Sequence, residues 1–364
     1  MAALRRWSLV ALTALALIAA PAAVGLLPAQ GSDLTAVQLR QRIADSASVA
    51  WSGEVSSRGT LGVPDTSSFG GIVDLLGENN SLRVWWRDPQ HWRVDTVRQT
   101  GETDLLRDAD QMTRWVFESG TATVTPFATV RLPDASDVLP SRLAARLLSG
   151  AGAGELSRLP SRRVAGRSAA GLRLTPSSAA STIDRVDVWA DEDTGLPLRV
   201  EVLGDGSPVP VITASVTSLD LHRPSADVVD FTAPPGAEVR SRDAIDVAAG
   251  ANAFAPFVLP DDLAGLDRRG DPADLGAVGI YGRGPTALIA VPLRRGLSGQ
   301  VREQLSAAAT ARTTPAGTTL QVGPLSILLT DGGRRRGTFL LAGTATPETL
   351  TQAAGDLQNE VTFR

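Results

Sequence analysis

The chain has 364 residues, of which 43% are hydrophobic and 20% charged, and its formal net charge at pH 7 is −4. This length can bury a large core and predicts two domains. The slightly acidic balance provides no basic footprint for nucleic acid, so we expect no nucleic-acid partner. Because cysteine is absent, disulfides, thiol catalysis, cysteine-ligated zinc and an acylated N-terminal cysteine are excluded.

Residues 1–30 have the composition of an export segment. Arg5 and Arg6 precede an apolar run, and Ala20 and Ala22 fit a small-x-small cleavage pattern. The run is also almost long enough to span a bilayer, so a cleaved signal peptide and a retained membrane anchor both stay open. In either case the remainder of the chain is expected to work outside the cytoplasm, in the cell envelope, either secreted or anchored at its N-terminus.

The first element after this segment is an expected helix. Ser32 or Asp33 can cap it, and Ala36, Leu39 and Ile43 lie at helical spacing on one stripe. The segment that follows, "SVAWSGEVS", alternates like a strand, with Trp51 on its apolar face.

The segment "SLRVWWRDPQHWRVDTV", residues 81–97, reads as a β-hairpin whose register can be tested by sorting its side chains. A loop with an even number of residues mixes charged and aromatic side chains on both faces. A loop with an odd number, such as 89–91, instead gathers five apolar residues on one face: Leu82, Val84, Trp86, Trp92 and Val94. We therefore expect the odd register, with Trp85 on the opposite, charged face under an arginine.

This apolar face needs a cover, because two indoles exposed to water are costly. The candidates are the helix at 141–149, the N-terminal helix and a bound apolar ligand. The residues alone leave two interpretations open, namely an ordinary core beneath a helix and a wall that a ligand can reach.

Further hairpins are expected over residues 101–130 and, most clearly, over 184–203. Between them, Pro140 and Gly150 bracket a helix. The apolar face of this helix carries Leu143, Ala144, Leu147 and Leu148.

All seven tryptophans lie in the first 189 residues, and a stretch of small residues near 240–255 suggests a domain join. Beyond it, "AVGIYG", "TALIAVPL", "LSILLT" and "TFLLAG" read as strands. A closing helix follows, with Thr346 as N-cap and Pro347 in its first position. Because hairpins dominate, the expected fold class is α+β with antiparallel sheets.

The motifs that suggest chemistry have simpler structural explanations. Asp193-Thr194-Gly195 matches an aspartic-protease triplet but has no second copy and lies in an expected turn. The two histidines, His91 and His222, have no ligand partner at metal spacing. No G-x-S-x-G occurs, and "GIYGRGP" lies between two expected strands. We expect no catalytic residue, no metal and no cofactor.

Several segments, taken in order, resemble the superfamily of the periplasmic lipoprotein carrier LolA and the sigma-factor regulator RseB (MucB). Within residues 33–240 they are "SASVAWSGEVSSRG", "WWRDPQHWRVDTV", "GETDLLRDADQMTRWVF", "RRVAGRSAAGLRLTP", "DRVDVWADEDTGLPLRVEVLG" and "LDLHRPSADVVDFTAPPGAEV". Residues 255–364 resemble the smaller C-terminal domain of RseB-type regulators through "FVLPDDLAGL", "VGIYGRGPTALIAVPL" and "GTFLLAGTATPETLTQAAGDL".

This resemblance implies a curved antiparallel half-barrel with lid helices, followed by a smaller α+β domain. It implies a non-enzymatic protein that receives a lipid, an acyl chain or a hydrophobic protein segment. The residues expected to line its cavity are Trp51, Val84, Trp86, Trp92, Val94, Leu143, Leu147 and Leu148. An RseB-like envelope sensor would act through a membrane signalling partner such as an anti-sigma factor. The alternative is a LolA-like carrier of lipids or lipoproteins.

Overall fold

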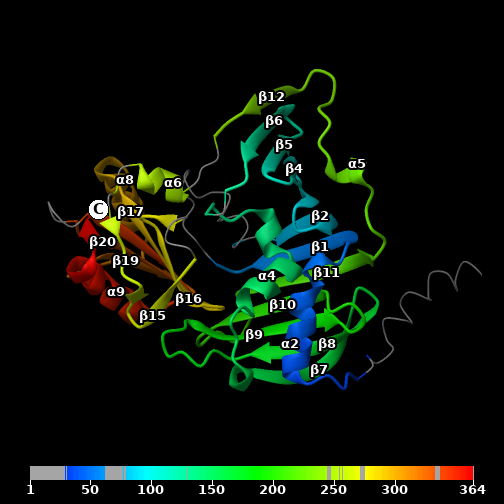
Figure 1. The fold of residues 1–364 in the computed structure, drawn as a ribbon, viewed down its shortest axis with the longest axis horizontal. Coiled ribbons are helices and arrows are strands. Elements are labelled where there is room, and N and C mark those ends of the chain that lie inside the picture. The colour runs from blue at the N-terminus through cyan, green and yellow to red at the C-terminus, as the bar shows by residue number, and fades with distance from the viewer. Residues whose placement is uncertain are drawn as a thin grey trace, which may run out of the picture.

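The computed structural model describes residues 31–61, 79–128, 130–243, 247–253, 257–270, 275–332 and 337–363, and the single positions 29, 77 and 255. The expected export segment lies almost wholly outside these residues. Among the described residues, none of the helices has the length and apolar character needed to cross a membrane. Figure 1 shows two sheets, one large and one smaller, that lie side by side.

The larger sheet has twelve strands from residues 51–241. In chain order they are β1 (Trp51–Gly59), β2 (Asn79–Asp88), β3 (His91–Arg98), β4 (Gly101–Asp108), β5 (Gln111–Val116), β6 (Thr121–Pro126), β7 (Leu156–Val164), β8 (Arg167–Leu174), β9 (Ile183–Asp191), β10 (Pro197–Gly204), β11 (Ile212–Asp220) and β12 (Glu238–Ser241).

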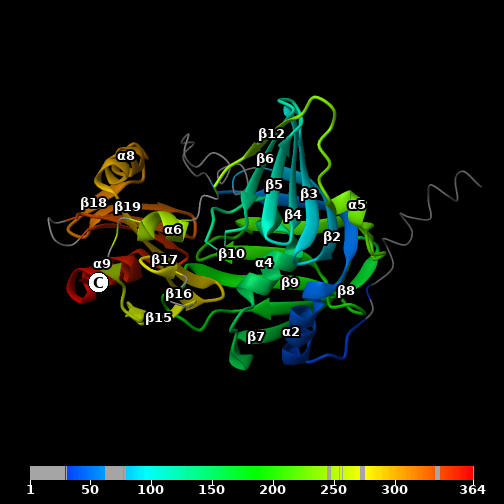
Figure 2. The same ribbon diagram turned by 45° about the horizontal axis from the view of Figure 1, so that its top comes forward.

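The order across this sheet is β12-β6-β5-β4-β3-β2-β1-β11-β10-β9-β8-β7, and only the β12–β6 pair is parallel. The sheet does not close into a barrel, because β12 and β7 form its two edges. Figures 1 and 2 show β4–β6 standing across the direction of β8–β10, so the sheet is strongly bent. The expected fold class, an α+β protein with an open, curved antiparallel sheet and a second smaller unit, is confirmed.

Short helices accompany the large sheet: α2 (Ala36–Asp45), η1 (Ser46–Ser48), η2 (Ala135–Val138), α4 (Pro140–Leu147), η3 (Ala153–Glu155) and α5 (Ala226–Val229). The first helix is capped by Thr35, whose side chain accepts from the backbone N–H of Gln38. The expected caps, Ser32 and Asp33, were therefore wrong by two to three residues, since Thr35 and Gln38 form a reciprocal capping box. Pro140 begins α4 as expected.

The smaller sheet has eight strands: β14 (Asp262–Leu263), β15 (Leu266–Arg269), β16 (Gly279–Arg283), β17 (Thr286–Leu293), β18 (Arg312–Thr314), β19 (Gly317–Val322), β20 (Leu325–Thr330) and β21 (Thr338–Gly343). Their order is β14-β15-β16-β17-β21-β20-β19-β18. A two-stranded pair, β13 (Phe257–Val258) and β22 (Thr362–Phe363), completes the strands of this part.

Among the described residues, the helices of the smaller sheet are α6 (Val247–Asn252), α8 (Arg295–Ser306) and α9 (Pro347–Glu360). The four expected strands and the closing helix, with Thr346 as N-cap, are confirmed. The sequence reading missed α8, which contains Gly296 and Gly299 and so has a low helix propensity. It forms because Val301 and Leu305 bury against the sheet.

The two sheets meet through backbone contacts near residues 180–182. Ser181 forms a bridge with Ala345, and the backbone N–H of Thr182 donates to the carbonyl of Thr344 at 3.0 Å. The Thr182 hydroxyl also donates to the carbonyl of Pro324, in the turn between β19 and β20. These bonds join the two sheets without a strand shared between them.

Candidate functional site

An apolar wall lies on one face of β1, β2 and β3. Across the β2–β3 hairpin, Trp86 is opposite Trp92 and Val84 is opposite Val94, and β1 places Trp51 opposite Trp86. The rings of Trp86 and Trp92 are stacked, with centroids 6.0 Å apart and planes 5° from parallel. The register expected from the alternation of the sequence is confirmed.

The turn that produces this register differs in detail from the expected loop. Asp88 pairs with His91, and the register shifts between Trp86 and Asp88. The odd offset therefore comes from a two-residue turn at 89–90 together with a bulge at Arg87, rather than from a three-residue loop. The Asp88 carboxylate accepts from the backbone N–H groups of Gln90 and His91, which stabilises the turn.

The indole N–H groups of the wall are incompletely satisfied. The Trp86 indole donates to the carbonyl of Ala47 at 3.4 Å. The indole nitrogens of Trp51 and Trp92 are buried, and neither has a hydrogen-bond partner among the described residues. Buried tryptophan N–H groups usually find an acceptor, so this wall contains two unpaired donors.

The wall is covered by the chain itself. Val138, at the end of η2, and Leu139, which links η2 to α4, belong to the same buried cluster as the tryptophans. The guanidinium carbon of Arg142, in α4, lies 5.7 Å from the ring centroid of Trp92. Only 5% of Trp86 and none of Trp92 is exposed. In this structure the wall is therefore closed, with the residues 135–147 forming its cover, which we name the lid.

The three leucines expected on the lid face a neighbouring part of the sheet. Leu143 and Leu148 are buried and Leu147 is partly buried in a second cluster, together with Leu39 and Ile43 of α2. Sequence reasoning missed Val138 and Leu139, because they precede the helix whose periodicity marked the apolar face. The five wall residues are thus brought together, while the three lid leucines pack beside them and not on the tryptophans.

Charged side chains anchor the lid. Arg131 pairs with Asp134 at 2.7 Å and with Asp137 at 2.8 Å, and Arg142 lies 3.5 Å from Asp137. Burial and the neighbouring Asp137 raise the pKa of Asp134. Burial also acts to raise the pKa of Asp137, but Arg131 and Arg142 outweigh it and hold this pKa below its usual value. The lid therefore begins in an ionic cluster and continues as an amphipathic helix.

The segment that follows the lid is bound to the smaller sheet. Arg283, at the end of β16, donates to the two carboxylate oxygens of Glu155 at 2.7 and 3.0 Å and to the carbonyl of Gly150 at 2.7 Å. Arg283 foremost, together with backbone donors, lowers the pKa of Glu155 to about 2. Arg269 of β15 adds a hydrogen bond to Ser149. We name these contacts between 149–155 and the smaller sheet the clamp.

The opposite face of β2–β4 carries an ion-pair network. Arg93 lies 5.3 Å from the ring of Trp85, as the sequence predicts, and pairs with Asp95 and Asp104. Burial and the nearby Asp95 raise the pKa of Asp104 to about 7. The carboxylates of Asp95, Glu102 and Asp104 lie within 4.8 Å of one another, which is metal-ligand spacing. Arg93 pairs with Asp95 and Asp104, and Arg83 pairs with Glu102, so the arrangement is that of an ion-pair cluster.

The remaining motifs do not contribute side chains to the wall cluster. Asp193 is exposed in the turn between β9 and β10, where it pairs with Arg167, and this agrees with the expected turn. His91 lies 2.9 Å from Asp88, and His222, which is 95% exposed, pairs with Asp220. Neither histidine belongs to the group of potential metal ligands found among the described residues.

Comparison with known proteins finds a matching family for part of the chain. Residues 104–235 match the family model described as the MucB/RseB N-terminal domain. This part of the chain is therefore similar to the MucB/RseB N-terminal domain, which confirms the resemblance to RseB (MucB) found in the sequence over these residues. None of the curated proteins compared with the chain matches it.

Solved structures similar to the chain include MucB and LolA-like proteins. The Pseudomonas aeruginosa MucA/MucB complex aligns with a TM-score of 0.48 and 16% identity over 90% of this chain and 99% of that chain. A structure of MucB aligns with a TM-score of 0.45 and 16% identity over 90% of this chain and 98% of that chain. A LolA superfamily protein from Nitrosomonas europaea aligns with a TM-score of 0.26 and 10% identity over 54% of this chain and 98% of that chain.

Proposed function

We propose that the chain is a non-enzymatic binding protein of the cell envelope, an RseB-like sensor that acts through a membrane signalling partner. The observation that carries this proposal is the tryptophan wall with two unpaired indole donors beneath a short lid. The match of residues 104–235 to the MucB/RseB family supports the class of protein.

The ligand of the wall is a lipid, an acyl chain or a hydrophobic protein segment. Exposing the indoles of Trp86 and Trp92 to water would cost about 8–12 kcal/mol, from about 150–250 Å² each at about 25 cal/mol per Å². The wall therefore opens only when an apolar group replaces the lid. A ligand with a carbonyl or ester oxygen would in addition supply an acceptor for the indoles of Trp51 and Trp92.

The lid is the element that moves in this proposal. Its helix α4 has only eight residues, and its Arg142 covers Trp92 through a cation–π contact. The residues Trp51, Val84, Trp86, Trp92 and Val94 would line the opened cavity, and Leu143, Leu147 and Leu148 would move with α4. The ligand shifts this equilibrium because it binds the open wall and not the closed one.

The clamp connects the lid to the smaller sheet. The residues 149–155 follow α4 directly and are held by Arg283 and Arg269 of the smaller sheet. Displacing the lid would strain these contacts and shift the conformational equilibrium of the smaller sheet. We propose that residues 33–240 and 255–364 are two domains, that the second contacts the partner, and that this partner is a membrane anti-sigma factor.

We propose also that residues 1–30 export the chain and either leave it secreted or anchor it to the membrane. This location would place the wall where envelope lipids are available. A diffusing carrier and a sensor differ in the outcome of lipid-transfer assays.

The test begins with the full chain purified from its own envelope, followed by mass spectrometry of an organic extract. Lipid at about one molecule per chain is the expected result. Titration with phosphatidylglycerol vesicles should then change tryptophan fluorescence in the wild type and in the control Trp115→Phe, whose indole packs against Phe231. The change should be smaller in Trp92→Phe, in which Trp51 and Trp86 remain as the reporters of the wall.

Two results would overturn the proposal. Empty samples together with fluorescence that vesicles leave unchanged would indicate a filled core without a ligand. Chain-dependent transfer of lipid between donor and acceptor vesicles, without lipid-dependent release of an anti-sigma factor, would indicate a carrier.

A further inference from the structure

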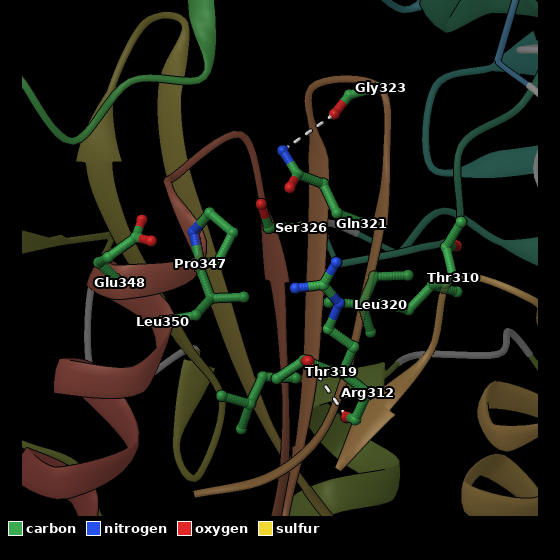
Figure 3. A pocket seen from close by; sticks show the side chains of 12 residues that line it. Thr310, Arg312, Thr319, Leu320, Gln321, Gly323, Ser326, Pro347, Glu348 and Leu350 are labelled. Carbon is green, nitrogen blue, oxygen red and sulfur yellow. Dashed lines mark hydrogen bonds between the residues drawn. The ribbon is translucent and has the colours of Figure 1, made fainter. Parts of the chain in front are cut away.

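A second binding site is suggested by a pocket in the smaller sheet, away from the tryptophan wall. Its volume is 480 Å³, within the range of small-molecule sites. It lies between the first turn of α9 and the strands β18, β19 and β20 (Figure 3). The lining residues are Thr310, Arg312, Thr319, Leu320, Gln321, Gly323, Ser326, Ile327, Leu328, Pro347, Glu348 and Leu350.

The pocket has an apolar floor with one polar group set into it. Leu328 and Leu350 are buried in the cluster between the sheet and α9. Ser326, next to Leu328 on the same face, is 1% exposed, and its hydroxyl has no hydrogen-bond partner among the described residues. A buried hydroxyl without a partner is unfavourable, so a ligand that supplies one is favoured.

The pocket contains a cation, the guanidinium of Arg312. Arg312 is on the edge strand β18 and lies opposite Thr319 of β19. The Thr319 hydroxyl donates to the backbone carbonyl of Arg312. Figure 3 shows its guanidinium in the middle of the pocket, between Ser326 and Thr319. The guanidinium makes no ion pair with any described residue. Glu348, on the first turn of α9, is the other charged lining residue.

We propose that this pocket binds a small amphiphilic monocarboxylate. The carboxylate would accept hydrogen bonds from the forked donors of Arg312. Because Ser326, Leu328 and Leu350 are at most 1% exposed, the ligand would displace the side chains that cover them, so that the Ser326 hydroxyl also donates to the carboxylate and the apolar body lies on the two leucines. One cation suits a monoanion, and the carboxylate of Glu348 on the opposite rim disfavours a dianion such as a phosphate monoester. This site is independent of the proposed function of the wall.

A small molecule fits the pocket better than an added peptide strand. β18 is the edge of the sheet, so a strand paired to it would lie about 4.8 Å beyond Arg312 and outside the pocket. The floor over β19 and β20 would stay empty in such a complex. The carboxylate of a protein C-terminus would have to enter end-on, and this alternative is one outcome of the test.

The experiment uses the full chain with labelled leucine methyl groups and titrates it with decanoate, with decanol as the uncharged match. Decanoate should shift the resonances of Leu328 and Leu350. Arg312→Gln should weaken its binding by about tenfold or more. Ser326→Ala should weaken it less, and decanol should bind more weakly than decanoate. The control Arg295→Gln removes an exposed arginine of α8 and should leave the affinity unchanged.

Four results would overturn the proposal. They are shifts confined to Leu143 and Leu148 near the wall, equal affinity for decanol and decanoate, equal affinity of Arg312→Gln and wild type, and a response to a peptide C-terminus but not to decanoate. Both Arg312→Gln and Arg295→Gln change exposed residues, so a difference between them reports the pocket and not the fold.

Discussion

Arg283 and Glu155, which are 128 positions apart in sequence, join the smaller sheet to the segment that follows the lid through two hydrogen bonds of 2.7 and 3.0 Å. Glu155 also accepts from the backbone N–H groups of Gly152 and Ser177. One carboxylate therefore organises the 149–155 loop and attaches it to the second sheet.

Removing the arginine should loosen the lid as well as the clamp. We expect Arg283→Gln to lower the free energy of unfolding by about 1 kcal/mol, because almost half of its side chain is exposed and water screens the pair. Amide hydrogen exchange in residues 143–155 should become faster. Arg295→Gln is the matched control. Unchanged exchange in the lid would contradict the proposed coupling.

The Arg283–Glu155 pair also predicts that the stability of the protein depends on pH in the acidic range. The pKa of Glu155 is lowered from 4.5 to about 2, so its contribution is present above pH 4.5 and is lost as the pH falls toward 2. The shift corresponds to about 3 kcal/mol at most, and to less after screening. Chemical denaturation between pH 5 and pH 2 should show a shallower decline for Glu155→Gln than for the wild type. Parallel curves would show that the Glu155 carboxylate is not responsible for the loss of stability in acid.

The two faces of the hairpin should differ in their tolerance of substitution. Trp92→Ala removes a fully buried indole and should cost about 3–5 kcal/mol. Trp85→Ala removes a partly exposed indole beneath Arg93 and should cost about 1 kcal/mol. Denaturant titration of the two variants measures the difference. Equal losses would mean that the lid does not protect the wall in solution.

The carboxylate of Asp104 should make the protein less stable as the pH rises. Its pKa is raised to about 7 by burial and by Asp95, so the protonated form favours folding and this contribution is lost between about pH 4 and pH 7. Asp104→Asn should remove that decline and add about 1–4 kcal/mol at pH 8. Asp205→Asn, at an exposed position, is the control. A stability curve that Asp104→Asn leaves unchanged would contradict the assigned pKa.

Local sequence was sufficient where a short-range rule acts. In the β2–β3 hairpin the two-residue period left one register that kept Trp86 and Trp92 together, and that register is found. Pro140 and Thr346 marked helix starts through their fixed dihedral angle and capping hydroxyl. The α8 helix was missed because its stability comes from Val301 and Leu305 packing on the sheet, which no local rule contains.

The sequence by itself determined the faces of the strands, the antiparallel fold class and the kinship of residues 104–235, since each follows from alternation, turn residues or their order along the chain. Only the tertiary structure decided what covers the tryptophan wall and what holds the cover. Val138 and Leu139 join the buried cluster of Trp92, Arg142 lies over the Trp92 ring, and Arg283 binds Glu155, across 40 or more positions of the chain. Such contacts depend on how the sheet bends and where the second sheet attaches, and many packings satisfy the same local pattern.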